Sequence, residues 1–137
     1  EAWAKIIRAH GTFAIVSISA RTIDRIGIAQ SLRNAVERAI IKLKQHPTMV
    51  LLDGSLHAPK EYRQRTIIKG DEKEPLIAAA SIIAKVHRDR HMKSMDKKYP
   101  GYGFAKHKGY GTAEHYRALK RSGRSKIHRK TFLSHEA

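Results

Sequence analysis

The segment of residues 66–92 constrains the fold of this chain more than any other. A short apolar stretch there stops at Gly70 and Asp71, and a helical pattern begins at Pro75. Small side chains are concentrated in the first part of that helix, at Ala78, Ala79, Ala80, Ser81 and Ala84. Because small side chains permit close approach, this order predicts a strand that ends at a carboxylate, with a helix packed tightly against it.

The spacing of apolar residues predicts the elements around that segment. Helices are predicted where apolar residues recur at helical spacing, at 1–10, 28–43, 75–99 and 112–123. Strands are predicted where short β-branched or apolar runs occur, at 12–19, 49–53 and 65–70. The continuous apolar run at 49–53 is expected to be buried on both faces, and the glycine-rich residues 101–112 are expected to be loop. We therefore predict an α/β fold, with helices around a central sheet.

The charge of the chain is strongly positive. Its 137 residues contain 28 Lys and Arg against 12 Asp and Glu, a formal net charge of +16. This excess predicts a polyanionic partner, of which nucleic acid is the usual one. A protein kept in solution by its charge, or a basic protein of the ribosomal type, would have the same composition. The length predicts a single domain over 1–137, with a basic helical region at 97–137.

That basic region interleaves Lys and Arg with aromatic side chains. Glu114 is the one acid between residues 97 and 132, and the aromatic residues between these limits include Tyr99, Tyr102, Phe104, Tyr110 and Tyr116. Basic groups bind phosphates, and an aromatic face stacks on a base or a sugar. Tyr110 lies between two glycines, so we predict a presented ring, whereas we expect Tyr102 and Phe104 to pack in the core. The alternative is a solvated helix face with a few core aromatics.

Absent residue types exclude several classes of site. The chain has no cysteine, so disulfides and thiolate metal sites are excluded, and its nine scattered His residues predict no histidine metal site. We find no apolar run long enough to span a membrane and no secretory signal, and we expect a cytoplasmic protein. Glu1 lies inside a predicted helix, so we expect that the natural beginning of the chain has been removed.

Two acids directly follow predicted strands. Asp53 ends the apolar run at 49–53, and Asp71 follows Gly70 at the end of the next strand. Carboxylate oxygens are the ligands of hard cations such as Mg²⁺, and two such cations hold the attacking water and the leaving oxygen of a phosphodiester. We expect the two acids to share one site. The plainer alternatives are a turn at Asp53 before Gly54 and a helix-dipole role for Asp71.

Three further acids are predicted to be structural. Asp89 lies on the long helix between Arg88 and Arg90, where an ion pair with a neighbouring Arg is favoured over a role in the site. Glu72 and Glu74 are expected in the first turn of a helix, where the dipole favours an acid. Two carboxylates are few for a two-metal site, so more acids would be required.

Five motifs follow one another along nearly the whole chain. They are VLLDG at 50–54, IIKGDEK at 67–73, IAAASIIAKVHRDRHM at 77–92, YPGYGFAKHKGYGT at 99–112 and IHRKTF at 127–132. In this order and spacing they resemble the bacterial ribonuclease HII family. The resemblance implies a ribonuclease H-like α/β fold with a mixed central sheet and four carboxylates that bind Mg²⁺ or Mn²⁺. It also implies cleavage of the RNA strand of RNA–DNA hybrids, including ribonucleotides embedded in duplex DNA, to 5′-phosphate and 3′-hydroxyl ends.

By position, the resemblance implies roles for particular residues. Asp53 and Asp71 correspond to the third and fourth catalytic carboxylates, which bind the metal. Tyr110 corresponds to the tyrosine that packs on the deoxyribose at the RNA–DNA junction. Further contacts with nucleic acid are assigned to three lysines, Lys69, Lys106 and Lys108.

Part of the family pattern is absent from the sequence. The first two carboxylates, an Asp-Glu pair, and the Gly-Arg-Gly that reads the ribose 2′-hydroxyl do not occur. We therefore expect the first strands of the domain to be missing, an open sheet edge that favours self-association, and little or no cleavage by residues 1–137 alone. Glu74 also stands where the family often has Ser. Two other functions stay open: a non-catalytic basic module that binds nucleic acid, and a DNA nuclease of the same superfamily.

Overall fold

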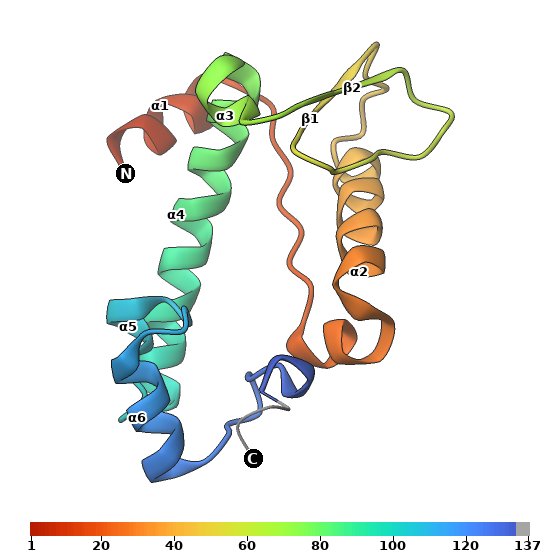
Figure 1. Cartoon of the computed structure of the whole chain (residues 1–137). Helices are drawn as coiled ribbons and strands as arrows, with labels where there is room; N and C mark the ends of the chain where they lie inside the picture. Colours follow the sequence, from red (N-terminus) through yellow and green to blue (C-terminus); the bar gives the residue numbers. More distant parts are fainter. Residues whose placement is uncertain (134–137) are drawn as a thin grey trace. The chain divides into compact units, whose positions relative to one another are not determined.

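The chain divides into two compact units in the computed structural model, which describes residues 1–133. The sheet unit is residues 1–83 with the segment that begins at Arg129, and the aromatic unit is residues 84–128. The elements, in chain order (Figure 1), are α1 (Ala2–His10), α2 (Ala20–Lys42), β1 (Val50–Asp53), β2 (Gln64–Ile67), α3 (Gly70–Lys73), α4 (Pro75–Lys98), α5 (Phe104–His107), α6 (Ala113–Ser122) and the 3-10 helix η1 (Lys130–Phe132). The single domain predicted from length stays a prediction.

Two parallel strands form the sheet of the sheet unit and confirm the α/β class. β1 and β2 pair along their whole lengths, so that Asp53 lies opposite Ile67 at the carboxyl end of both strands. The connection between them folds onto the side chain of Gln64. Its amide accepts from the Ala58 N–H at 2.9 Å and donates to the Ala58 carbonyl at 3.0 Å. The strand predicted at 49–53 is confirmed as β1. The strand predicted at 65–70 is shorter than expected, because β2 ends at Ile67 and the short helix α3 begins at Gly70.

The core of the sheet unit is small. Ile40 of α2, Leu52 of β1 and Ala58 are buried in one cluster, with partly buried apolar side chains around them. The expectation that residues 49–53 are buried on both faces is wrong, because Leu52 is the one buried residue of β1. Within residues 1–133 the sheet has two strands, so β1 is hydrogen-bonded to a strand along one edge.

The prediction of a strand at residues 12–19 is wrong. These residues run as a drawn-out coil between α1 and α2 (Figure 1) and pair with no strand of the described chain. Their β-branched composition favours extended backbone, but a strand also requires a partner for its N–H and C=O groups. Lys42 supplies one such contact, from Nζ to the Ile15 carbonyl at 2.9 Å. Ser19 then caps α2, where its Oγ accepts from the Thr22 N–H at 3.1 Å.

The predicted helices of the sheet unit are confirmed, with one earlier start. α2 begins at Ala20, and Gly27 interrupts it with a non-helical φ of 79° and ψ of 162°. Helical apolar spacing begins only after that interruption, which is why the prediction covered residues 28–43. The buried Ser31 donates from Oγ to the Gly27 carbonyl at 2.7 Å. Pro75 is the first residue of α4, as predicted.

Phe104 lies at the centre of the aromatic unit and is 1% exposed. The buried cluster around it consists of Met92, Tyr102, Phe104 and Ala118, which confirms the core packing predicted for the two aromatic residues. The loop predicted at 101–112 is partly wrong, because α5 forms one helical turn inside it. Gly103 and Lys108, with φ of 77° and 54°, bracket that turn, and burial of Phe104 stabilises it. The glycine content of the segment had favoured a loop over this helical turn.

The last predicted helix is confirmed at both ends. Thr112 caps α6, accepting from the His115 N–H at 3.2 Å, and Gly123 follows the helix with a φ of 70°. The Tyr102 hydroxyl contacts the end of this helix, where it donates to the Gly123 carbonyl at 2.9 Å. Among residues 1–133, no helix is both long and apolar enough to cross a membrane.

Candidate metal and nucleic-acid site

Asp53 and Asp71 lie at one corner of the sheet, which we call the acid corner (Asp53, Gly70 and Asp71). Asp53 is the last residue of β1, and its Oδ1 accepts from the Gly70 N–H at 2.7 Å. Asp71 is the next residue after Gly70 and is exposed in the first turn of α3. The parallel pairing places Asp53 at the carboxyl end of the sheet, and the hydrogen bond from Gly70 brings the start of α3, with Asp71, next to it.

Gly70 permits this close approach because it has no side chain. Gly70 is buried, and a Cβ there would lie 2.6 Å from Cδ1 of Ile77 and 3.4 Å from Asp53 Oδ1. The preceding residue, Lys69, has a left-handed backbone, with φ of 53° and ψ of 49°. Lys69 thus turns the chain sharply between β2 and α3, and α4 packs against the glycine through Ile77. Lys69 itself is exposed beside the acid corner.

The ligand types of the acid corner suit a hard divalent cation. Mg²⁺ commonly keeps several waters and binds through one or two carboxylates, which is the number that Asp53 and Asp71 offer. The Gly70 N–H orients the Asp53 carboxylate in advance. Over the described residues, no group of three or more His, Cys, Asp or Glu is arranged to hold a metal ion. The corner is therefore a small ligand set rather than a complete two-metal cage.

The other predicted acids have different surroundings. Glu74 is not in a first helical turn, because it ends α3 with an extended φ of −125° and donates its N–H to the Gly70 carbonyl at 2.8 Å. Glu72 does lie in the first turn of α3 and is exposed, as expected. Asp89 is half-buried on α4, and the ion pair predicted for it stays a prediction.

Tyr110 is an exposed ring on a tightly held backbone. Its side chain is 66% exposed, as the flanking glycines predicted. Its N–H donates to the His107 carbonyl at 2.9 Å, and its own carbonyl accepts from the Thr112 N–H at 2.8 Å and lies 3.0 Å from His115 Nδ1. Backbone bonds on both sides fix the direction of a ring that contacts little else. Such a ring is suited to stack on a flat group of a binding partner.

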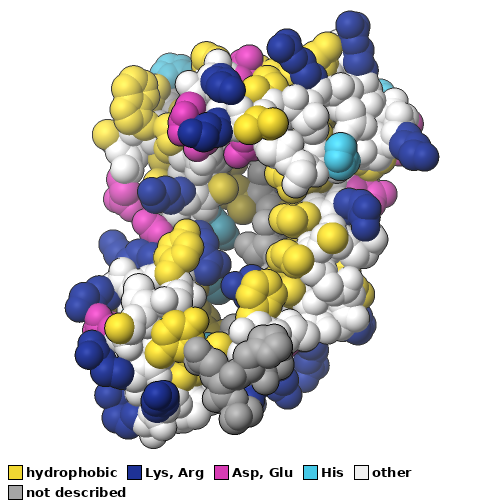
Figure 2. Space-filling view, in the orientation of Figure 1, with side chains coloured by type: hydrophobic (Ala, Val, Ile, Leu, Met, Phe, Trp, Pro, Cys, Tyr) yellow, Lys and Arg dark blue, Asp and Glu magenta, His cyan; other side chains and the backbone are white. Residues whose placement is uncertain are grey.

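The two lysines predicted near Tyr110 have internal partners. Lys106 Nζ lies 2.6 Å from Glu114 Oε2, in an ion pair whose lysine side chain is 76% exposed. Lys108 Nζ donates to the Ala105 carbonyl, and the Lys108 carbonyl accepts from Arg88 at 2.9 Å. An exposed ion pair contributes little stability, so a phosphate competes readily for Lys106. Figure 2 shows Lys and Arg side chains gathered over α5 and α6.

Three buried histidines in the aromatic unit were missed by the sequence analysis. His107, His115 and His128 each expose less than a tenth of their surface, and His115 Nε2 lies 3.0 Å from His128 Nε2. The His107 and His115 rings stack at 4.4 Å between centroids. Burial lowers the pKa of His115, and burial followed by the nearby charge of His115 lowers the pKa of His128. His115 and His128 lie 13 residues apart, with the end of a helix between them, so no spacing rule could have grouped them.

The comparison with protein families decides the affiliation of this α/β chain. The model of the family "Ribonuclease HII" matches residues 5–135. The chain belongs to the ribonuclease HII family. Its fold agrees with the ribonuclease H-like architecture implied by the motifs, an α/β arrangement that here is mostly helical with a small parallel sheet.

Curated relatives support the same affiliation. The chain is 48% identical over 123 residues to a ribonuclease HII from Prochlorococcus marinus, covering 89% of this chain and 64% of that protein. It is 45% identical over 132 residues to a ribonuclease HII from Coxiella burnetii, covering 96% and 65%. A third, from Pelagibacter ubique, is 45% identical over 129 residues, covering 93% and 69%. The chain thus spans roughly two thirds of the length of these relatives.

Proposed function

We propose that this chain carries part of the active site and the nucleic-acid-binding surface of a metal-dependent endoribonuclease. The substrate is the RNA strand of RNA–DNA hybrids, including single ribonucleotides in duplex DNA, and the products have 5′-phosphate and 3′-hydroxyl ends. The observation that supports this most is the 2.7 Å hydrogen bond from Gly70 to Asp53, which brings the start of α3, with Asp71, to the end of β1 in a chain of the ribonuclease HII family.

In this proposal the acid corner holds Mg²⁺ or Mn²⁺ through Asp53 and Asp71. A bound divalent cation supplies Lewis-acid stabilisation of the phosphodiester and makes water a stronger nucleophile. The Gly70 N–H keeps the Asp53 carboxylate oriented before any ligand arrives, so less ordering is required on binding. Lys69, exposed beside the corner, neutralises a neighbouring phosphate.

Nucleic-acid binding is assigned to the aromatic unit. The exposed ring of Tyr110 packs on a sugar, and Lys106 and Lys108 contribute charge for the phosphates on either side. The net charge of +16 favours the approach of any nucleic acid, so affinity is expected to fall steeply with salt. A module that only binds nucleic acid is the second candidate function, and this charge favours it as strongly as it favours a nuclease.

We expect residues 1–137 by themselves to bind metal and nucleic acid but to cleave poorly. Two-metal hydrolysis of a phosphodiester requires ligands for two cations, and the acid corner offers two carboxylates. No larger group of His, Cys, Asp or Glu suited to a metal occurs in the described part of the chain. Metal binding is therefore the sharper test of the nuclease proposal.

Paramagnetic Mn²⁺ provides that test, because a bound ion broadens the NMR signals of amides near it. We expect broadening at Gly70 and its neighbours in the 137-residue chain. The double variant Asp53→Asn with Asp71→Asn should lose it, and the matched control Glu61→Gln, an exposed acid of the same unit, should keep it. Equal broadening in the double variant would favour the binding module instead.

A cleavage assay separates the remaining nuclease alternatives. Three labelled duplexes are incubated with the chain and Mn²⁺: one with a single ribonucleotide, one RNA–DNA hybrid and one of DNA alone. We expect weak cleavage of the first two, lost in Asp71→Asn. Cleavage of the all-DNA duplex at the same rate would indicate a DNA nuclease. Efficient cleavage that survives Asp53→Asn would contradict the assignment of the acid corner.

A further inference from the structure

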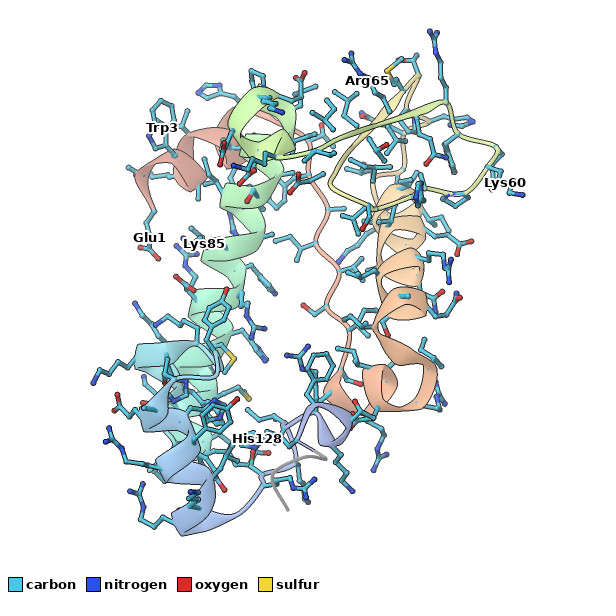
Figure 3. The ribbon with its side chains drawn as sticks, viewed as in Figure 1. Glu1, Trp3, Lys60, Arg65, Lys85 and His128 are labelled. Atoms are coloured by element: carbon cyan, nitrogen blue, oxygen red, sulfur yellow. The ribbon has the colours of Figure 1, made fainter. Side chains whose placement is uncertain are left out.

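The carbonyl of Tyr110 is the end of a hydrogen-bonded chain that begins at Ser125. The Ser125 N–H donates to His128 Nδ1 at 2.9 Å. His128 Nε2 lies 3.0 Å from His115 Nε2, and His115 Nδ1 lies 3.0 Å from the Tyr110 carbonyl oxygen. Figure 3 labels His128 among the side chains of this unit. The chain thus connects the segment after α6 to the loop that presents the exposed tyrosine.

The two ends of this chain allow a single arrangement of protons. A backbone N–H can only donate, so His128 Nδ1 accepts and the proton of that ring is on Nε2. Ser125 Oγ, 2.8 Å from the same Nδ1, then acts as a donor as well. His128 Nε2–H therefore donates to His115 Nε2, which accepts. The proton of His115 is then on Nδ1 and donates to the Tyr110 carbonyl, which can only accept. Every donor meets an acceptor when both rings are neutral.

The surroundings of the two rings oppose a positive charge. His107 of α5 stacks on His115, and the charges of His107 and Arg124 both disfavour protonation of His128. The apolar ring of Phe104 contacts both histidines, at 5.7 Å and 5.4 Å between centroids. Within the described residues no carboxylate is paired with either ring, since Glu114 pairs with Lys106. An added proton would also set one N–H against another inside the chain.

We propose that His115 and His128 are positioning residues, which as a neutral pair fix the Tyr110 carbonyl and so direct the exposed ring toward nucleic acid. The proposal rests on the assignment of Tyr110 to nucleic-acid contact. It predicts that acid disrupts the pair and removes the contribution of Tyr110 to binding. Acid also changes the overall charge of the chain, so total affinity is a poor measure of this effect.

The ratio of dissociation constants between Tyr110→Ala and the unmodified chain is the suitable measure, because changes in overall charge cancel in it. It is obtained by fluorescence anisotropy with a labelled duplex that contains one ribonucleotide. At pH 7.5 we expect a ratio of about 5- to 150-fold, the loss typical of removing an aromatic stacking contact. Toward pH 5 we expect the ratio to approach one.

Two substitutions of His115 separate its two hydrogen bonds. His115→Gln places its amide where Nε2 was, so it keeps the hydrogen bond with His128 and loses the hydrogen bond to the Tyr110 carbonyl. His115→Asn places its amide where Nδ1 was and keeps a donor for that carbonyl. In each His115 variant the ratio is measured again, with and without Tyr110→Ala. We expect this ratio to fall toward one in His115→Gln and to stay close to that of the unmodified chain in His115→Asn. His91→Gln, an exposed histidine of the same unit, is the matched control and should leave the ratio unchanged.

The outcomes distinguish the two proposals. A large ratio that His115→Gln and acid both leave intact overturns the positioning role, while Tyr110 keeps its role in binding. A ratio near one in the unmodified chain at pH 7.5 overturns the Tyr110 contact itself, and the positioning proposal with it. Nitrogen-15 NMR of the histidine rings adds a test that requires no variant, since a proton on Nδ1 of His128 at neutral pH contradicts the proposed arrangement.

Discussion

The loop around Tyr110 and the acid corner are held in place by different means. Two backbone hydrogen bonds of Tyr110 and a chain of buried rings hold the Tyr110 loop, all within the aromatic unit. At the acid corner, one hydrogen bond joins Asp53 to Gly70, and Asp71 is exposed. The binding loop is thus supported by its own unit, whereas the corner depends on the close packing of one glycine.

Exposed apolar side chains accentuate this difference. Ile68 and Leu76, on either side of the acid corner, are 75% and 70% exposed, and Trp3 of α1 is 68% exposed (Figure 3). In the aromatic unit, Tyr110 is the one large hydrophobic side chain of comparable exposure among the described residues, at 66%. A surface with several large apolar side chains exposed favours association, so we expect the sheet unit to set the tendency of this chain to self-associate.

Phe104→Ala should produce the largest effect and the clearest separation of the two units. Removal of a fully buried aromatic side chain costs about 3–5 kcal/mol, and Phe104 is the largest fully buried side chain in the described structure. We expect hydrogen exchange to accelerate at amides of residues 99–128 and much less at β1 and β2. The matched control is Phe13→Ala, because Phe13 is 40% exposed in the sheet unit. Equal acceleration in both units would contradict their independence.

The sequence predicted this aromatic core because its residues are local. Tyr102 and Phe104 lie two positions apart, and the helix that covers them has clear capping signals at Thr112 and Gly123. The one-turn helix α5 was missed, since its stability comes from the burial of Phe104 rather than from helix-forming residues. The failure at residues 12–19 has the same kind of cause, because strand formation depends on a partner that composition does not reveal.

The candidate site was predictable to a similar extent. The position predicted for Asp53 is confirmed, because it is the last residue of β1. Asp71 was expected at the end of the next strand but lies in α3, four residues after β2 ends at Ile67. The hydrogen bond from Gly70 was not predictable, since it depends on the left-handed backbone at Lys69. The histidine pair was beyond reach for another reason: His115 and His128 meet through the fold of the aromatic unit and follow no local pattern.

Gly70→Ala should have the next largest effect, and it acts on the acid corner. The new Cβ would lie 2.6 Å from Cδ1 of Ile77, so one of the two must shift. Overpacking of this kind costs about 1–3 kcal/mol. We expect a lower midpoint of urea unfolding and weaker Mn²⁺ broadening at the corner. Ile77→Ala in the same chain should recover part of the Mn²⁺ effect, because it removes the clashing atoms. If Gly70→Ala alone leaves Mn²⁺ binding unchanged, the close approach of Gly70 is not what orients Asp53.

Mild acid should have the smallest effect and should again separate the units. Burial lowers the pKa of His115 and His128 in the folded chain, so the unfolded chain takes up protons first as the pH falls. Their contribution to stability is therefore complete above the unfolded value of about 6.5 and is lost as the pH falls from there through the lowered pKa. In the sheet unit, backbone hydrogen bonds from Thr131 and Lys130 lower the pKa of Asp24, so Asp24 stays ionised across this range.

Between pH 7.5 and 5 we expect the hydrogen-exchange protection of the aromatic unit to fall relative to that of β1 and β2. The double variant His115→Asn with His128→Asn should show a smaller fall. A uniform loss of protection in both units would show that the buried histidine pair does not cause it.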